Sequence, residues 1–412
     1  MELHARDRGR MLVLTGARQC GKSTLAGISF PERPRIDLDS PIERETYARM
    51  SPNEWIQRYP QAIVDKVQKL PELFDTLKAC YDRDPTVRYL LLGSSQILLM
   101  RRVRETLAGR GALMELFPLT LTELTARDGS APVESLCIRL LRSDRPAVEL
   151  AQTLDPVYAL SNDYAVAQSR WQDFLIWGGM PVLTREGWTD DDRFEWLRDY
   201  QLTYLQRDLG DLAQLDRLEP FVRAQRSAAM RTAQTINFSE LARLADVAPA
   251  TARKFMRYLE LSYQILMLPA WFRNPEKRLA KQPKLHFLDP GIRRAILGQR
   301  GAANGAEFES AVIAEIFKQC QNARLPLTFH HLRTVDGRGV DLLVEREDGF
   351  IAVEVKQTDH TAATDFRHLR RLDEILDKPL LLGLVVSQDG RFRQPESGDE
   401  PLWNVAAPHL LA

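Results

Sequence analysis

The sequence predicts an α/β protein with a parallel, helix-covered sheet at its N-terminus, a helical middle and a second α/β domain at its C-terminus. Three observations favour this class. A short apolar segment at 11–15 runs into the glycine-rich segment 16–23, and a helical pattern follows. Further apolar segments alternate with helical ones, which is typical of βαβ units. Near the C-terminus, residues 340–345 and 350–356 read as two paired strands.

The composition is that of a folded protein with several domains. The chain has 412 residues, of which 44% are hydrophobic and 27% charged, and about two to three domains are expected at this length. The 56 basic and 56 acidic side chains cancel, so the total charge favours no class of partner. The longest apolar run, 379–386, is far short of the ~18 residues that a membrane span needs, so we expect no membrane partner.

The cysteines and the N-terminus bear on the compartment. Four cysteines lie far apart, at Cys20, Cys80, Cys137 and Cys320. Their spacing fits neither a metal site nor a disulfide framework, which favours reduced thiols and a cytoplasmic protein. The polar N-terminus runs straight into a strand and is not expected to be a signal peptide. Because the glycine-rich segment lies so close to residue 1, we also expect that an upstream segment could be missing.

The glycine-rich segment predicts a phosphate site. Residues 16–23 fit GxxxxGK[ST] between a strand and a helix, which is the context that makes this motif specific. The glycines let backbone N–H groups point at phosphate oxygens, and the helix N-terminus adds positive potential. We expect Lys22 to reach the β- and γ-phosphates of ATP and the Ser23 hydroxyl to ligate Mg²⁺. The predicted nucleotide-binding residues of this segment are Gly16, Gly21, Lys22, Ser23 and Thr24.

Four more strands are expected in this part, at 33–39, 61–65, 87–93 and 112–117. Asp65 ends the second of them, where a carboxylate that organises Mg²⁺ belongs. Its simpler interpretation is a strand-ending aspartate in a turn. Ser94 follows the third, where a polar side chain can contact the γ-phosphate.

In their order, these motifs resemble the bacterial and archaeal AAA-type P-loop ATPases that carry an attached C-terminal domain of unknown function. The resemblance covers nearly the whole chain. It implies an ATP-binding oligomer with Mg²⁺ as cofactor, an NTPase sheet and a helical connector. The segments that carry it are GARQCGKSTL, AIVDKVQKLPEL, LLGSSQ, LAGRGALMELFPLTLTEL, WGGMPVL, YLQRDL and VDLLVEREDGFIAVEVK.

One position departs from the pattern of that family. After Asp65 the family carries a glutamate that polarises the attacking water, whereas this chain carries Lys66. A lysine with its usual pKa of ~10.4 cannot do this while protonated, although it could pair with the γ-phosphate and tighten binding. ATP binding is therefore predicted, and hydrolysis depends on whether another acid takes the place of the glutamate.

Two arginines are candidates for a finger that reaches the phosphate of a neighbouring subunit, as such ATPases use. They are Arg110 and Arg207. The alternative for each is an ordinary surface or ion-paired arginine. A homo-oligomer is implied by the resemblance alone.

The middle of the chain is expected to be helical and then to form a winged helix-turn-helix. Residues 190–212 have helical spacing and read as a connector or lid helix. From 236, two helices are predicted, the first capped by Ser239 and the second started by Pro249. Two strand-like segments, 262–272 and 284–289, follow with a basic segment between them.

The charge of this region favours contact with DNA or RNA. Residues 221–258 hold seven Lys and Arg against two Asp and Glu, and residues 271–286 hold five against one. Such a pattern is typical of phosphate-backbone binding. The alternative is a winged helix used for packing or for protein contact. The predicted nucleic-acid contacts are Arg253, Lys254 and Arg257.

The C-terminal hairpin predicts a second site. Asp341 is followed by a twelve-residue spacer and then Glu354 and Lys356. Alternation along the strand puts Glu354 and Lys356 on one face, where Asp341 can approach from the paired strand. Two carboxylates can hold Mg²⁺ at a scissile phosphate, and the lysine can orient the attacking water. Glu309, on a helix upstream, is a further acid.

This order of elements resembles the PD-(D/E)xK restriction-endonuclease-like fold. A basic helix at 364–376 and a strand at 379–387 complete the expected order. A solvated hairpin with a Glu–Lys pair is the alternative, and the fold does not by itself imply nuclease activity. His330 and His331, placed just before the sheet, are expected to have no role in the chemistry.

We therefore predict four parts and two functional hypotheses. The leading hypothesis is an ATP-dependent factor that binds or processes nucleic acid. The alternative is a nucleotide-gated switch or scaffold that binds ATP without turnover and recruits a protein. The predicted parts are the P-loop core 1–125, the helical connector 126–220, the winged helix-turn-helix 221–290 and the nuclease-like domain 291–412.

Overall fold

The computed structural model describes residues 10–93, 110–126, 130–153, 161–204, 218–274, 276, 278, 281–334, 337–392, 394 and 401–412. The chain forms two compact units. The first comprises 1–118, 202–216 and 261–263, and the second comprises 119–201, 217–260 and 264–412. These units are coarser than the four parts expected from the sequence, so that finer division stays a prediction.

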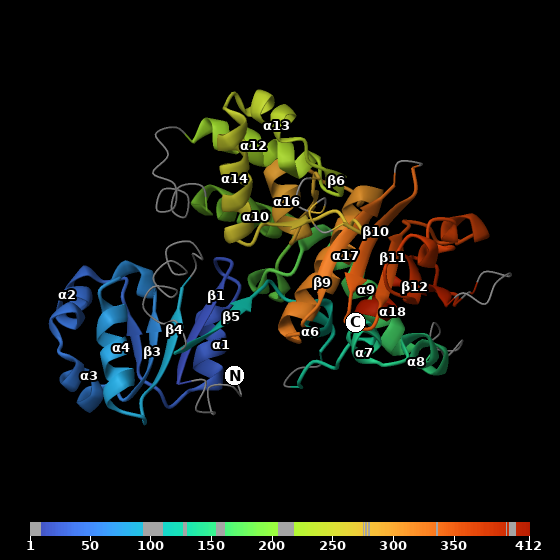
Figure 1. Ribbon diagram of the computed structural model, residues 1–412. Helices are drawn as coiled ribbons and strands as arrows, with labels where there is room; N and C mark the ends of the chain where they lie inside the picture. The colour runs from blue at the N-terminus through green and yellow to red at the C-terminus, as the bar shows by residue number, and fades with distance from the viewer. Residues whose placement is uncertain are drawn as a thin grey trace. The chain divides into compact units, whose positions relative to one another are not determined.

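The first unit is built on a five-stranded parallel sheet with the order β2-β3-β4-β1-β5 (Figure 1). All five strands predicted from the sequence are present. In this order β4 lies between β1, which leads into the glycine-rich segment, and β3, which ends at Asp65. The bounds are β1 Met11–Gly16, β2 Arg35–Asp37, β3 Gln61–Asp65, β4 Arg88–Leu92 and β5 Gly111–Leu116.

Helices cover both faces of this sheet because its strands are apolar on both sides. Val13 packs with Trp55 of α3 and Phe74 of α4 on one face. Its neighbour Leu12 points to the other face and packs with Ala26 of α1. The helices are α1 Lys22–Ser29, α2 Pro41–Arg49, α3 Pro52–Arg58 and α4 Leu73–Arg83.

The second unit begins with helices, as the sequence predicted for the middle of the chain. They include α9, which ends at the glycine pair of the WGGMP segment. The bounds are α6 Leu121–Thr125, α7 Leu136–Arg142, α8 Pro146–Thr153, α9 Asn162–Trp177, α10 Asp190–Thr203, α12 Glu219–Met230 and α16 Pro290–Leu297.

The glycine pair has a structural explanation. Gly178 has φ +75°, and a Cβ there would lie 2.1 Å from an oxygen of the buried Asp289. A Cβ on Gly179 would lie 2.2 Å from the carbonyl oxygen of Leu119. Asp289 accepts a hydrogen bond from Gly179 N at 2.8 Å and also caps α16 through Ile292 N. Only glycine permits this close approach.

Between α12 and α16 the chain forms two helices and a small antiparallel sheet, whose strand order is β6-β8-β7. Pro249 starts α14 as predicted. The predicted cap of α13 is wrong: Asn237, not Ser239, accepts hydrogen bonds from the first N–H groups of the helix. The bounds are β6 Gln234–Thr235, α13 Phe238–Ala245, α14 Pro249–Leu261, β7 Ile265–Leu268 and β8 Lys284–Phe287.

The C-terminal sheet has the order β13-β12-β11-β10-β9, antiparallel from β9 to β11 and parallel from β11 to β13. The predicted hairpin is β10 and β11. His330 and His331 lie within β9, so their expected place before the sheet is wrong. The bounds are β9 Thr328–Arg333, β10 Gly339–Glu345, β11 Phe350–Val355, β12 Leu380–Ser387 and β13 Leu402–Ala406.

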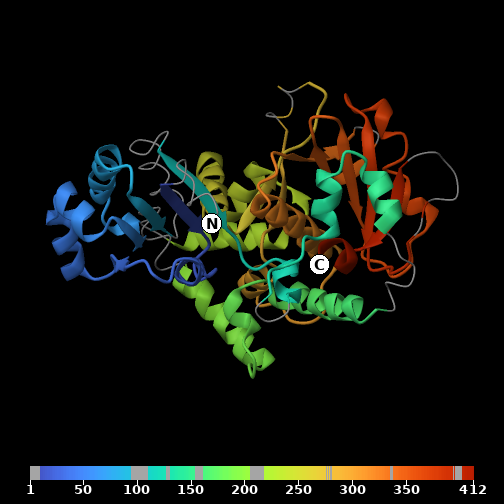
Figure 2. The ribbon, with the colours of Figure 1, turned by 90° about the horizontal axis from the view of Figure 1, so that it is seen from below.

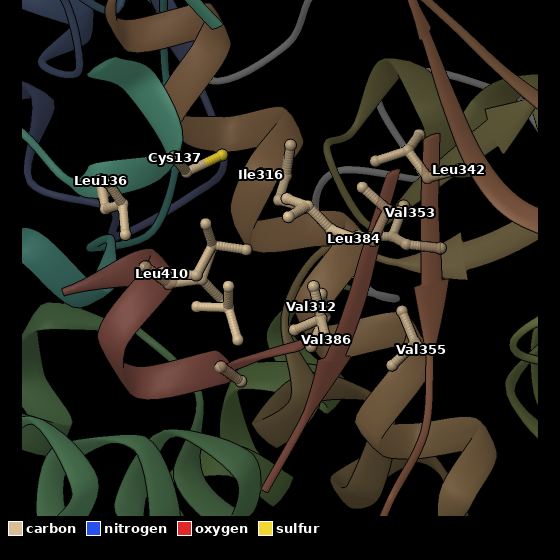
Figure 3. Close-up of a cluster of buried hydrophobic side chains, with 14 of the residues drawn as sticks. Leu136, Cys137, Val312, Ile316, Leu342, Val353, Val355, Leu384, Val386 and Leu410 are labelled. Carbon is tan, nitrogen blue, oxygen red and sulfur yellow. The ribbon is translucent and has the colours of Figure 1, made fainter. Parts of the chain in front are cut away.

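One face of this sheet packs against α17 Gly305–Asn322, α18 Ala407–Leu411, α7 and α8. In Figure 2, α7 and α8 are the teal helices beside the orange-red strands. Figure 3 shows the resulting core, in which Val312 and Ile316 of α17 lie beside Val386 and Leu384 of β12. Cys137 of α7 lies in the same cluster, and none of the four cysteines forms a disulfide.

The opposite face is covered by two short 3-10 turns, Ala363–Phe366 and Leu372–Glu374, so the basic α-helix predicted at 364–376 is wrong. Arg371 between them has φ +55°, a left-handed conformation that interrupts any regular helix. Even so, the side chains of Phe366 and Leu372 are buried and pack against this face of the sheet.

Candidate functional site

The glycine-rich loop of the first unit has the conformation that a phosphate site requires. Gly16 has φ +155°, and a Cβ there would lie 2.1 Å from the carbonyl oxygen of Leu116. Gly21, with φ +96°, is the N-cap of α1. Side chains other than hydrogen fit neither position. The loop therefore directs the backbone into the N-terminus of α1, where N–H groups are free to bind an anion.

The structure brings together the side chains predicted to hold Mg²⁺–ATP. Ser23 Oγ donates to Asp65 Oδ2 at 2.7 Å, and the aspartate is buried. Lys22 Nζ donates to the carbonyl oxygens of Gly16 and Ala17, at 3.0 and 2.6 Å. A hydroxyl and a carboxylate side by side are fitting ligands for Mg²⁺, which binds oxygen. Thr24 is exposed in α1, and Ser94 lies outside the described residues.

The carboxylate of Asp65 has a second cationic neighbour. Arg35 Nη2 of β2 lies 2.5 Å from the same Oδ2 that accepts from Ser23. This arginine was not among the residues predicted for the site. The local sequence does not relate it to Asp65, because the pairing of β2 with β3 is seen only in the structure. Asp65 Oδ2 thus accepts from both Ser23 and Arg35.

Lys66, at the position of the family glutamate, points to two other acids. Its Nζ lies 3.2 Å from Asp37 and 2.8 Å from Asp39, and its backbone has φ +57°. Lys69 also pairs with Asp39, and hydrogen bonds from Lys66 and Lys69 hold the pKa of this carboxyl well below its usual range. Asp37 lies in register with Asp65 on the adjacent strand, so it is one candidate for a replacement acid.

Of the two candidates for an arginine finger, the structure describes Arg110 but not Arg207. Arg110 makes a two-pronged ion pair with Asp82, at 2.8 and 3.2 Å, and its hydrogen bond lowers the pKa of that aspartate. This ion pair fits the alternative interpretation of an ordinary ion-paired arginine, and both of its partners belong to the same chain. Arg207 lies outside the described part of the structure. A finger role stays a prediction for both.

The residues predicted for the C-terminal site also lie together. Asp341 of β10 accepts from Val355 N at 2.9 Å through Oδ2. Glu354 of β11 is 3% exposed, and its Oε1 pairs with Lys356 Nζ at 2.6 Å. Lys356 and Glu354 are thus neighbours on one face of the strand, as predicted.

Sequence reasoning missed one central residue of this site. Lys284, the first residue of β8, has its Nζ 2.5 Å from Glu309 Oε1 and 2.9 Å from Asp341 Oδ1. All three side chains are at most 17% exposed. In the sequence, Lys284 is only one of the five basic residues of 271–286. Nothing in the local sequence relates β8 to the acids of α17 and β10.

Burial dominates the electrostatics of this cluster. It raises the pKa of Glu309 to about 8 and that of Glu354 to about 7, with the charge of Asp341 adding to both shifts. Burial alone would lower the pKa of Lys284, but Asp341 and Glu309 outweigh it and raise that pKa. The lysine is thus held as a cation, and it compensates part of the buried negative charge.

The cluster opens on a pocket of about 440 Å³. The cluster as it stands does not fit a bound metal ion. The described residues contain no group of three or more His, Cys, Asp or Glu side chains placed to hold a metal ion. The ammonium of Lys284 lies between two of the acids instead. The pocket is lined by Lys284, His331, Arg333, Asp341, Glu354 and His368, among others.

The residues predicted to contact nucleic acid are exposed together on α14. The guanidinium of Arg253 lies 4.2 Å from the ring centre of Phe238, and Lys254 Nζ lies 5.6 Å from that of Tyr258. Arg257 pairs with Glu260 at 3.2 Å. Two of the three cations are therefore held by aromatic rings rather than by acids, which leaves their charge available to an anion.

Family models match three successive parts of the chain. An AAA domain matches residues 8–125, a domain of unknown function (DUF8612) matches 168–303, and another domain of unknown function (DUF4143) matches 304–405. Residues 8–125 are thus an AAA-type P-loop domain, as the sequence predicted. The nuclease-like and winged-helix interpretations stay predictions.

Two mycobacterial proteins are similar to nearly the whole chain. They are described as uncharacterized proteins, Rv2008c of Mycobacterium tuberculosis and Mb2031c of Mycobacterium bovis. Each is 28% identical over 427 residues, covering 99% of this chain and 84% of its own length.

Two solved structures are distant matches. The Walker-type ATPase PABY2304 of Pyrococcus abyssi has a TM-score of 0.39 and 15% identity, covering 70% of this chain and 91% of its own. The DNA clamp loader delta protein of Bacillus subtilis has a TM-score of 0.21 and 12% identity, covering 77% and 98%. Scores this low carry no argument about function. No helix in the described ranges is long and apolar enough to cross a membrane.

Proposed function

We propose that this chain binds Mg²⁺–ATP in its AAA domain and that the bound nucleotide controls how its second unit contacts DNA or RNA. The observation that carries the nucleotide site is the 2.7 Å contact between Ser23 and Asp65, next to Lys22 in a glycine-rich loop. Two oxygen ligands, an ammonium and a helix N-terminus converge there, and each has a counterpart in Mg²⁺–ATP.

The residues of the loop have distinct tasks in this proposal. The N–H groups at the start of α1 bind phosphate oxygens, and Lys22 exchanges the carbonyls of Gly16 and Ala17 for the β- and γ-phosphates. Ser23 and Asp65 hold the cation, which neutralises the phosphates. Lys66 is paired with Asp37 and Asp39, so it is held as a cation and is not a base for the attacking water.

The nucleic-acid part of the proposal rests on the second unit. We interpret α13, α14 and the strands β7 and β8 as a winged helix-turn-helix whose exposed cations on α14 contact the phosphate backbone. We interpret the sheet β9–β13 with α17 as a restriction-endonuclease-like domain. Its acids lie together, which supports this interpretation.

ATP turnover is the test of the first part. We would compare the unmodified chain with Lys66→Glu, using Lys22→Ala as the blank. Turnover by the unmodified chain above the blank means that another acid, such as Asp37, replaces the glutamate. If neither protein binds ATP more tightly than Lys22→Ala does, the proposed site is wrong.

The pairing of Lys66 favours a second candidate function. If Lys66→Glu hydrolyses ATP and the unmodified chain only binds it, the chain is a nucleotide-gated switch that holds ATP and recruits a protein. The two functions differ in their response to salt. Binding to nucleic acid should weaken steeply with salt and be lost on Arg253→Ala/Lys254→Ala, whereas a protein-recruiting switch should show neither effect.

Cleavage is a separate part of the proposal. A nuclease that uses the C-terminal acids should require Mg²⁺ or Mn²⁺ and should fail to cut when Glu354 is replaced by alanine. If Glu354→Ala and the unmodified chain cut equally well, Glu354 takes no part in the reaction.

A further inference from the structure

A second pocket of the second unit lies at the edge of the C-terminal sheet. Its volume is about 770 Å³, and its walls come from the edge strand β9 and from residues 270–273, which follow β7. This volume is within the range of pockets that hold small molecules and cofactors. The pocket shares four lining residues with the 440 Å³ pocket: Thr235, His331, Leu332 and Arg333. The two pockets are therefore neighbours.

Backbone hydrogen bonds hold the walls of the larger pocket in place. His331 N of β9 donates to Pro269 O at 2.9 Å, and Trp271 N donates to His331 O at 2.7 Å. The segment after β7 thus pairs with the edge of the sheet through one bridge, from Ala270 to His331. The ring of Trp271 packs on that of Phe350 in β11, with 5.8 Å between their centres. The pocket is therefore preformed, and little ordering is needed when a ligand binds.

The charge of this pocket is positive. Arg273, Lys281 and Arg333 line it, and all three are exposed. No Asp or Glu is among the described residues that line it. Arg273 donates to a backbone carbonyl, that of Leu376, rather than to an acid. Such a wall complements an anion, and guanidinium groups are well suited to phosphate.

An aromatic wall adds a second preference. Phe272 lines the pocket and is partly exposed, and Lys281 Nζ lies 5.6 Å from the centre of its ring. Trp271 also lines the pocket. It is 2% exposed, and its Nε1 has no hydrogen-bond partner among the described residues. A buried donor without an acceptor is costly. A planar ring with acceptor atoms at its edge would stack on Phe272 and offer that donor an acceptor.

We propose that the larger pocket binds one unpaired nucleotide of a single-stranded DNA or RNA segment, with its base on Phe272 and its phosphates on Arg273, Lys281 and Arg333. A planar ring joined to an anion is the chemistry of a nucleotide. A base within a duplex is paired and stacked, so it cannot enter a pocket. The neighbouring 440 Å³ pocket gives room for the next nucleotide, which favours a strand over a free nucleotide. This inference rests on the nucleic-acid part of the proposed function and names its substrate class.

The test is binding of a short fluorescein-labelled oligothymidylate to the full chain without ATP, measured by fluorescence anisotropy. The same strand annealed to oligoadenylate is the duplex probe, and oligouridylate is the RNA probe. Phe272→Leu should weaken binding of the single strands at least about fivefold, because stacking is lost, and should leave their salt dependence unchanged. Arg333→Gln should also weaken it and should lower the slope of log affinity against log salt by about 0.7, as expected for one phosphate contact. Neither variant should change binding of the duplex.

Two controls separate this pocket from other sources of binding. Arg170 is exposed on α9 and lines neither pocket, so Arg170→Gln should change neither affinity. Free thymidine monophosphate should displace the labelled strand only at much higher concentration than an unlabelled strand does, because it occupies one pocket alone. If both compete equally well, the pocket takes a free nucleotide and the inference is overturned.

Failure of the inference can be told apart from failure of the proposed function. If Arg253→Ala/Lys254→Ala abolishes duplex binding while Phe272→Leu and Arg333→Gln leave single-strand binding unchanged, only the inference is wrong. It is also wrong if these two variants weaken single-strand and duplex binding equally. If neither probe binds the unmodified chain, both are wrong. Each variant should keep the melting temperature of the parent; if Phe272→Leu does not, the salt slope of Arg333→Gln, at an exposed position, decides.

Discussion

Lys66 in the first unit and Lys284 in the second make the same kind of contact in different surroundings. Each lysine bridges two carboxylates, Asp37 and Asp39 in one case and Glu309 and Asp341 in the other. The side chain of Lys66 is 35% exposed and its acids are 42% and 52% exposed, whereas Lys284 is 13% exposed.

This difference determines what each lysine can do. Water solvates Lys66 and its acids well, so the bridge contributes little to stability and can be exchanged for a phosphate. Burial makes the second bridge costly to break, because either partner would be left charged without compensation. The first lysine is thus suited to respond to a ligand, and the second to hold its site in one state.

Removing the buried lysine should have the largest effect on stability. We expect Lys284→Ala to lower the free energy of unfolding of the second unit by about 3 kcal/mol, because Glu309 and Asp341 lose their shared cation. Urea unfolding followed by circular dichroism measures this. Lys284→Arg is the control and should retain most of the stability. A loss no larger than that of Lys66→Ala would break the comparison.

Acid should affect the second unit more than the first. Burial lowers the pKa of His409 to about 4, below the unfolded value of ~6.5. The unfolded chain then binds the proton more readily, so stability falls as the pH falls from about 6.5 to about 4, by up to about 3 kcal/mol from this residue. The described part of the first unit contains no histidine.

Thermal melting at pH 7 and pH 4.5 tests the effect of acid. His409→Gln should reduce the loss of melting temperature between the two pH values. The exposed His360→Gln is the matched control and should leave that loss as it is. An identical loss in all three proteins would mean that burial of His409 does not contribute.

The nucleotide site of the first unit should show a moderate effect on ligand binding. We expect Asp65→Asn to weaken ATP binding in the presence of Mg²⁺ by about tenfold and to leave binding in EDTA almost unchanged, because the amide is a poorer ligand for the metal. Fluorescent-nucleotide titration measures both affinities. Asp37→Asn, one strand away, is the control. If it weakens binding equally, Asp65 has no special role in holding the metal.

Removing the exposed lysine should have the smallest effect. We expect Lys66→Ala to change the free energy of unfolding by less than about 1 kcal/mol, since partly exposed ion pairs contribute little. High salt should reduce the difference further. A larger loss at high salt than at low salt would contradict an exposed bridge.

Sequence reasoning succeeded where the signal was local. The strand, glycine loop and helix around Lys22 lie within one segment, and the contact of Ser23 with Asp65 follows from the order of parallel strands. The hairpin that carries Asp341 and Glu354 was also readable from alternation and a turn.

Sequence reasoning failed where the structure depends on partners that are distant in the sequence. Lys284 and Asp341 are 57 residues apart in sequence, and no periodicity relates them. Ser239 and Asn237 are both good helix caps, and only the course of the backbone selects Asn237. The 364–376 segment has helical spacing, but Asp373 accepts from Leu380 N and Arg371 turns left-handed, which favours 3-10 turns.

The origin of Lys284 in β8 has a consequence for how this chain can be divided. A fragment that began at residue 304 would keep Glu309, Asp341 and Glu354 and lose the cation that lies among them. Its acids would have to take up protons to become neutral. The acids of such a fragment would therefore lie in a different electrostatic environment from those of the full chain. The chemical unit of the C-terminal domain is thus larger than its sequence segment.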